Sequence, residues 1–145
     1  MATKTHDHPT AHPMPALACD CHVHVFGPFD RFPLWADRAY TPGAASIEDL
    51  MALHQSLGIG RVVVVQASPQ GSDNRCTVDA LKRINALGHG ARGVAVIDEH
   101  TSDSELRAMH AAGVRGVRVN LESAGLHDPQ MARRLMQAAA ERVAP

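Results

Sequence analysis

The chain has 145 residues, of which 45% are hydrophobic and 20% are charged, a balance typical of one globular domain. Its formal net charge of −1 argues against a nucleic-acid-binding protein and against attachment to an acidic membrane surface. No hydrophobic run approaches the length of a membrane span, and three cysteines without an apolar leader favour the cytoplasm over a disulfide-stabilised secreted protein.

Residues 1–16 are polar and interrupted by prolines, so we expect a flexible tail there. The histidines of this segment, His6, His8 and His12, are interpreted as solvated side chains rather than metal ligands. The first apolar run begins at Leu17 and opens a single predicted domain over residues 17–145.

Short apolar runs then alternate with segments of helical spacing. The predicted strands are 17–26, 61–68, 92–98 and 114–121, and the predicted helices are 46–58, 77–88, 102–113 and 129–144. Two of these helices begin with capping boxes, formed by Ser46 with Asp49 and by Ser102 with Glu105. A glycine follows the last apolar position of each of the first three helices and predicts its end.

Four successive strand–helix units predict an α/β fold with a curled parallel sheet and helices outside it. A complete (β/α)₈ barrel needs roughly 250 residues, so we interpret the chain as the first four βα units, the N-terminal half, of a TIM barrel. Two alternatives are a half-barrel completed by a second copy and a flavodoxin-like doubly wound sheet. Open sheet edges predict self-association and marginal stability of the isolated chain.

The first predicted strand carries two histidines, His22 and His24. Because side chains alternate along a strand, Asp20 should share their face while Cys19, Cys21, Val23 and Val25 meet the helices. Imidazoles at i and i+2 converge on one divalent ion, and nitrogen ligands suit zinc. Such a site needs further ligands, of which His100 is one candidate, and a purely structural role for the histidines is the alternative.

Polar residues also close the other three strands. Gln66 and Ser68 are expected to point inward after the second strand, and Asp98 ends the third. Arg118 shares a face of the fourth strand with Asn120, and its planar guanidinium suits a substrate carboxylate. A structural ion pair of Arg118 with Asp98 or Asp20 is the alternative.

Five ordered blocks, "DCHVHVFGP", "RFPLWADRAYTPGAAS", "VVVVQAS", "GSDN" and "GVRGVRVNL", resemble the amidohydrolase superfamily, in the amidohydrolase-related branch that contains the 2-pyrone-4,6-dicarboxylate lactonases. The resemblance implies a distorted barrel that hydrolyses carboxylated lactones. It implies that His22 and His24 bind a divalent metal or polarise the lactone carbonyl without a required metal. It further implies that Tyr40, Ser68 and Arg118 contact the substrate, with a general-base aspartate beyond Pro145.

The sequence therefore predicts part of a longer hydrolase acting on a carboxylated lactone or related cyclic ester or amide. We expect either no required cofactor or one divalent metal, for which zinc is the candidate, and a small-molecule carboxylated substrate as the binding partner. A metal-dependent decarboxylase of the same superfamily and a non-catalytic truncated half-barrel are the alternatives.

Overall fold

A computed structural model of the chain describes residues 14–121, 125 and 127–144. The predicted tail, with His6, His8 and His12, falls almost wholly outside the described residues. The elements are β1 (Cys19–Val23), α1 (Ile47–Leu57), β2 (Arg61–Val65), the short 3₁₀ helix η1 (Ser68–Gln70), α2 (Arg75–Ala86), β3 (Gly90–Ala95), α3 (Asp103–Ala112), β4 (Val114–Val117) and α4 (Pro129–Val143).

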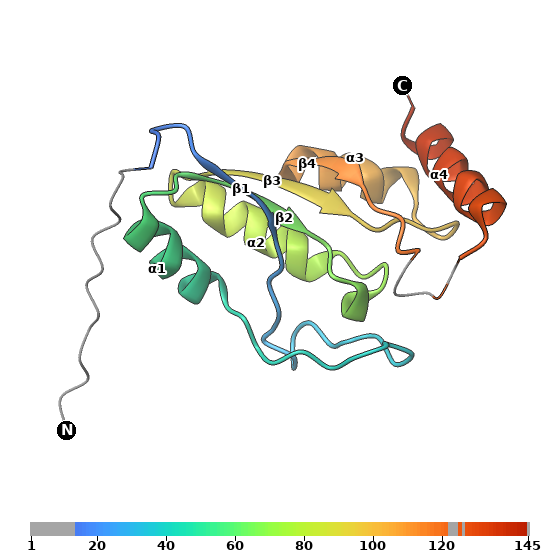
Figure 1. The fold of residues 1–145 in the computed structure, drawn as a ribbon, viewed down its shortest axis with the longest axis horizontal. Coiled ribbons are helices and arrows are strands. Elements are labelled where there is room, and N and C mark those ends of the chain that lie inside the picture. The colour runs from blue at the N-terminus through green and yellow to red at the C-terminus, as the bar shows by residue number, and fades with distance from the viewer. Residues whose placement is uncertain (1–13, 122–124, 126, 145) are drawn as a thin grey trace.

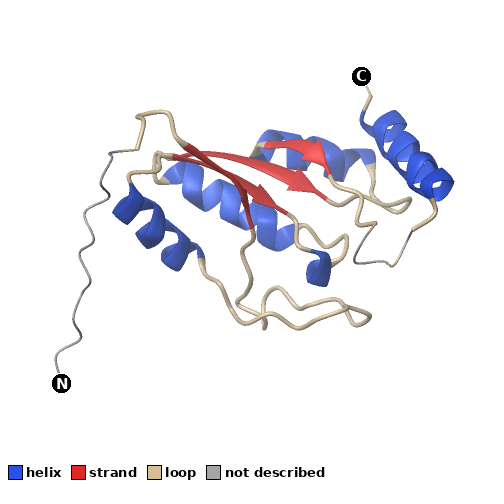
Figure 2. Cartoon of the chain, in the orientation of Figure 1, coloured by secondary structure: helices blue, strands red, loops and turns tan. Residues whose placement is uncertain are grey.

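The strands form one parallel 4-stranded sheet in the order β1-β2-β3-β4 (Figures 1 and 2). Right-handed crossovers between strands in sequential order place the connecting helices on one face of the sheet. Accordingly, α2 lies along this face and contacts both α1 and α3. The prediction of four consecutive βα units is confirmed. The doubly wound alternative is wrong, because it requires a change of strand order and helices on both faces.

Local signals set the helix boundaries. Ser46 with Asp49 and Ser102 with Glu105 both form capping boxes, as predicted. Asp128 caps α4, whose first residue is a proline. These caps satisfy backbone N–H groups that have no partner inside the helix.

The hydrophobic core lies between the sheet and the first three helices. Its strand residues come mainly from β2, β3 and β4, and its helix residues mainly from α2. The most buried members include Val62, Val64, Ala91, Leu81 and Ile84. No helix of the described residues covers the opposite face of the sheet, which we call the open face.

Gly93 on β3 is expected to tolerate no side chain. A Cβ there would lie 2.6 Å from Leu81 Cδ1 and 3.3 Å from Val114 Cγ2. We expect Gly93→Ala to lower the free energy of unfolding by about 1–3 kcal/mol through overpacking, as measured by urea denaturation. Gly60→Ala is the matched control, because a Cβ at Gly60 meets nothing within 4 Å. Equal midpoints for the two variants would contradict the packing described here.

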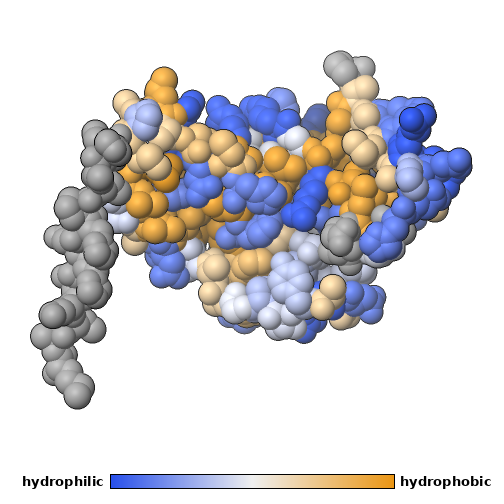
Figure 3. All heavy atoms as spheres, viewed as in Figure 1, coloured by the Kyte–Doolittle hydropathy of each residue, from blue (hydrophilic) through white to orange (hydrophobic). Residues whose placement is uncertain are grey.

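The sheet edges and α4 are less enclosed. β1 and β4 are the two edge strands, and α4 contains no buried residue. Arg142 joins α4 to α3 through an ion pair with Asp103 at 2.7 Å. Figure 3 shows hydrophobic residues on the viewed face, over the strands and beside α4. Within the described ranges, no helix combines the length and apolar character needed to cross a membrane.

Candidate functional site

A bulge in β1 decides where its histidines point. Asp20 pairs with Val62 and Val23 pairs with Val64, so β1 contains one residue more than β2 over the same stretch. Asp20 and Val23 therefore both face the helices, although strict alternation places them on opposite faces. The prediction that Asp20 shares a face with His22 and His24 is wrong. Cys21, expected to meet the helices, is exposed.

The two histidines lie together on the open face. Their rings are perpendicular, with centroids 5.1 Å apart, and His22 is exposed whereas His24 is half-buried. His24 Nδ1 lies 2.8 Å from the carbonyl oxygen of Val65. Since a carbonyl only accepts, Nδ1 carries the hydrogen and Nε2 of the neutral ring keeps its lone pair. His24 Nε2 can therefore bind a metal ion or accept a proton.

Burial lowers the pKa of His24 below its usual value. The hydrogen bond to Val65 acts in the opposite direction, while the charges of His22 and Arg118 lower the pKa further. The structure therefore favours the neutral imidazole at neutral pH. In that form His24 has no free N–H for a substrate oxygen, so direct polarisation of a carbonyl falls to His22.

Arg118 joins this site from the far edge of the sheet. Its Nη1 donates a 3.1 Å hydrogen bond to the carbonyl oxygen of Gln66. Gln66 directly follows Val65, whose carbonyl holds His24. The carbonyls of Val65, the last residue of β2, and of Gln66 thus hold His24, which directly follows β1, and Arg118, which directly follows β4. No carboxylate of the described residues forms an ion pair with Arg118, so the alternative of a structural ion pair with Asp98 or Asp20 is not found among them. The remaining guanidinium donors can bind an anion.

Gln66 supports the site from behind. Its side chain is fully buried, donates to the carbonyls of Gly71 and Asp73, and accepts a 2.6 Å hydrogen bond from Thr77. The prediction that Gln66 points inward is therefore wrong. Val62 and Val64 face the helices, and alternation continued past the end of β2 at Val65 places Gln66 on that same side. Its role is to fix the backbone carbonyl that Arg118 contacts.

A hollow of about 890 Å³ lies at the carboxyl ends of the strands. Ser68, Asp98 and Asn120 line it from the strand ends, and residues 33–39 line it from the long loop after β1. Hydrogen bonding from Ser72, together with bonds from the His100 amide and the Thr101 hydroxyl, lowers the pKa of Asp98. The hollow is a concave surface that can admit a small molecule. His22, His24 and Arg118 are not among the residues that line it, and the assignment of Ser68 as a substrate contact stays a prediction.

Tyr40 belongs to the same loop but is not among the residues that line the hollow. It is 49% exposed, and its hydroxyl forms no hydrogen bond with another described residue. The structure therefore does not bring Tyr40 to the histidines, and its assignment as a substrate contact stays a prediction.

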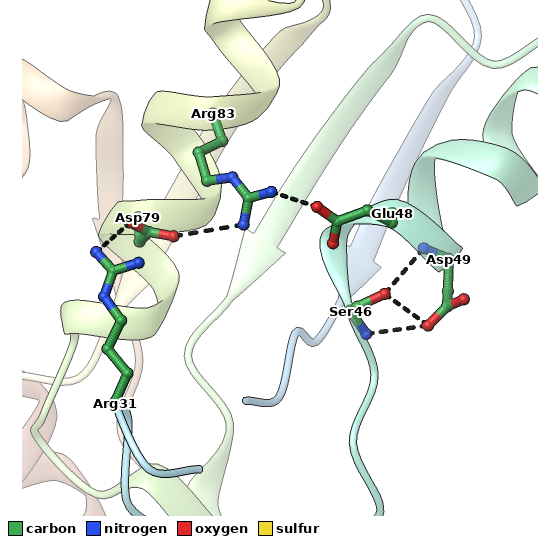
Figure 4. Close-up of polar contacts among 6 residues, drawn as sticks. All are labelled: Arg31, Ser46, Glu48, Asp49, Asp79 and Arg83. Atoms are coloured by element: carbon green, nitrogen blue, oxygen red, sulfur yellow. Dashed lines mark hydrogen bonds and ion pairs between the residues drawn. The ribbon is translucent and has the colours of Figure 1, made fainter. Parts of the chain in front are cut away.

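The loop itself is anchored at several points. Arg31 forms an ion pair with Asp79 of α2 at 2.9 Å, and the Trp35 amide donates to Pro69 at 2.8 Å. Figure 4 shows Arg31 and Arg83 converging on Asp79, with Arg83 also reaching Glu48 of α1. The contacts of Arg31 and Trp35 hold the loop against α2 and η1, and Arg83 links α2 to α1.

A metal site would need ligands beyond these two histidines. Among the residues that the structure describes, no group of three or more histidine, cysteine, aspartate or glutamate side chains is arranged to hold an ion. The His100 side chain is 86% exposed and lies 3.7 Å from Glu99, so the described residues do not support it as an added ligand. His22 and His24 can contribute two nitrogen ligands.

The lowered pKa of His24 predicts a pH dependence of stability. Because the unfolded histidine binds a proton more readily, the stabilisation is complete above about pH 6.5 and is lost as the pH falls through the lowered folded pKa. We expect His24→Gln to flatten this part of the curve of unfolding free energy against pH, measured by denaturation in metal-free buffer. An unchanged slope would show that His24 titrates alike in both states.

The chain is similar to known hydrolases in sequence. A family model described as amidohydrolase matches residues 19–145. The 2-pyrone-4,6-dicarboxylate hydrolase of Comamonas testosteroni is 52% identical over 107 residues, which are 74% of this chain and 34% of that protein. The 4-sulfomuconolactone hydrolase of Rhizobium radiobacter is 40% identical over 112 residues, which are 76% of this chain and 36% of that protein.

A solved structure is similar over the same region. The crystal structure of a probable 2-pyrone-4,6-dicarboxylic acid hydrolase from Acinetobacter baumannii, with citric acid bound, matches with a TM-score of 0.65 and 26% identity. The match covers 81% of this chain and 44% of that one. The chain thus spans about a third of the length of the curated relatives, 34% and 36% for the two named above.

Proposed function

Because this chain belongs to the amidohydrolase family, we propose that it is the N-terminal half of a barrel enzyme that hydrolyses a carboxylated lactone or a related cyclic ester or amide. Relatives that are lactone hydrolases support this class of reaction. The structural observation that carries it is the position of Arg118. Its guanidinium has no carboxylate partner among the described residues and is held on the carbonyl next to the one that holds His24.

In the proposed reaction, the oxygen of a water molecule bonds to the lactone carbonyl carbon. The ring C–O bond then breaks, the ring oxygen leaves with a proton, and the product is an open hydroxy acid. His22 donates a hydrogen bond to the carbonyl oxygen, where negative charge develops. His24 Nε2 accepts a hydrogen bond from the water, and Arg118 orients the substrate carboxylate. A general base from the rest of the protein completes the activation of water.

The residues present also partly fit a divalent metal. The lone pair of His24 Nε2 and a nitrogen of the exposed His22 would hold one ion, and zinc suits nitrogen ligands. When bound, such an ion stabilises charge on the carbonyl oxygen. We propose that any metal binds here, with its remaining ligands supplied by segments outside this chain.

Arg118→Met is to be assayed in the chimaera that is described in the next paragraph. It is expected to raise KM for a carboxylated lactone and to lower kcat/KM by about 10- to 100-fold. The loss corresponds to about 1.5–3 kcal/mol for a hydrogen bond to a charged group. Arg115→Met is the matched control, because Arg115 donates to the His110 carbonyl on the helix side. The role of Arg118 is contradicted if Arg118→Met leaves kcat/KM unchanged, or if both variants lose activity equally.

The reaction itself can be tested in a chimaera in which the 107 residues of this chain that match replace their counterparts in the Comamonas testosteroni enzyme. We expect a folded chimaera that hydrolyses 2-pyrone-4,6-dicarboxylate, and the assay should include a neutral lactone and an aromatic carboxylic acid. If the lactone is hydrolysed at the same rate in the presence of chelators, the reaction does not require a metal. If carbon dioxide is released from the aromatic acid and no lactone is hydrolysed, the enzyme is a decarboxylase and the proposed hydrolysis is wrong.

The proposal also covers the location of the protein and its binding partners. We propose a cytoplasmic location, supported by the three free cysteines, Cys19, Cys21 and Cys76. The proposed partner is a small carboxylated molecule, with no role for nucleic acid or a membrane. The open β1 and β4 edges favour self-association of the isolated chain.

A further inference from the structure

We propose that Asp20 and His54 are a positioning pair that holds the β1 bulge and thereby directs His22 and His24 to the open face of the sheet. Neither Asp20 nor His54 contacts the substrate in the reaction above. The inference rests on the proposed function only for the statement that the two histidines face a substrate. The directions of the two side chains, which the pair explains, do not depend on a substrate.

The bulge is required by the directions of three side chains. In a regular strand, Asp20, His22 and His24 would point to the same face. Asp20 is instead paired with Val62, which is 2% exposed on the helix side, whereas the two histidines point away from the helices. Only the extra residue between Asp20 and Val23 allows both directions in one strand. A slip by one residue would turn the histidines toward the core.

Both carboxylate oxygens of Asp20 are engaged at this point. Oδ2 accepts a hydrogen bond from His54 Nε2 at 3.1 Å, and Oδ1 accepts a longer one from the His22 amide at 3.4 Å. The first bond holds Asp20 on the helix side, and the second holds the backbone inside the bulge. One side chain thus links helix α1 to the residue that must face the substrate.

His54 is suited to anchor the carboxylate. It is 1% exposed within α1, so its imidazole is fixed by packing, and Asp20 provides a partner for its buried N–H group. His110 offers a natural comparison, because it follows the first residue of α3 by the same interval as His54 follows that of α1 (Asp103 to His110, Ile47 to His54). His110 is exposed and has no such partner among the described residues.

The test is NMR of the full chain with nitrogen-labelled histidines, comparing His54→Leu and Asp20→Asn with the unmodified protein. In the unmodified protein we expect a His24 signal with the proton on Nδ1 and a nuclear Overhauser effect between the His22 and His24 rings. His54→Leu should lose both signals while the β2 and β3 amide signals persist. Asp20→Asn should weaken them, because only one amide oxygen remains to serve two donors.

Two further variants separate positioning from stability. His54→Gln keeps a side-chain N–H donor and should restore the ring contact in part, whereas His110→Gln should change nothing. Lower melting temperatures with both histidine signals intact in His54→Leu and Asp20→Asn would overturn the proposal, since the pair would then serve stability alone. These signals are read without substrate, so a failure of lactone hydrolysis in the chimaera leaves the result unaffected.

Discussion

His24→Ala in the chimaera is expected to lower kcat/KM for the lactone by about 10²- to 10⁴-fold, with little change in melting temperature. The Nε2 lone pair is lost, while the ring removed is only half-buried on the open face of the sheet. Steady-state kinetics and thermal melting of the same preparations measure both effects.

The matched control is His89→Ala. His89 precedes β3 at the amino end of the sheet, away from the rim where His24 lies. We expect its kcat/KM to remain within about twofold of the parent chimaera, since a substitution outside the site leaves the transition-state contacts unchanged. Equal losses in the two variants would mean that His24 affects activity through folding rather than through its nitrogen.

Leu81→Ala is expected to lower the free energy of unfolding by about 2–5 kcal/mol. Leu81 is 0% exposed, and its Cδ1 lies in the space that a side chain on Gly93 would need. The substitution leaves a cavity between α2 and β3, where the sheet and the helix layer meet. Urea denaturation of the chain gives the value directly.

Leu87→Ala serves as its control, because Leu87 is 65% exposed at the end of α2. A change of no more than about 0.5 kcal/mol is expected for such a surface position. If Leu81→Ala were no more destabilising than Leu87→Ala, the core described between α2 and β3 would be incorrect.

The elements that could be predicted from the sequence are those set by local signals. Ser46 and Ser102 form the expected capping boxes, because the partners of each lie three residues away. The order of the four strands followed from the repeated βα pattern, because right-handed crossovers leave few other arrangements. His22 and His24 could be placed on the face away from the helices because they alternate with the apolar residues Val23 and Val25. The same alternation gave the wrong face for Asp20, since it did not include the bulge.

The bulge could not be predicted, since its cause is a contact with His54 that lies 34 residues later. A strand with and without an inserted residue has the same local pattern, so Asp20 was assigned to the wrong face. Gln66 shares the face of Val62 and Val64, so its position beside Thr77 on the helix side agrees with alternation along the second strand. The error on Asp20 arose from the bulge, and the error on Gln66 arose because the inward face of the second strand was assigned to the wrong set of alternating residues.

The contact between Arg118 and the end of β2 marks the limit of the sequence-based account of the site. The sequence indicated an inward arginine on the fourth strand but left its partner open between an anion and a carboxylate. The structure provides the Gln66 carbonyl, which orients the guanidinium without neutralising it. The role assigned to Arg118 therefore depends on geometry that composition and spacing do not contain.

The most direct measurement is a crystal structure of the chimaera with a carboxylated lactone, or its hydroxy-acid product, bound. The account predicts a ligand carboxylate within hydrogen-bond distance of the Arg118 guanidinium. It also predicts the ring carbonyl, or the carboxylate formed from it, beside His22 and His24. A ligand bound away from the ends of β1 and β4, or one whose carboxylates bypass Arg118, would contradict the proposed site.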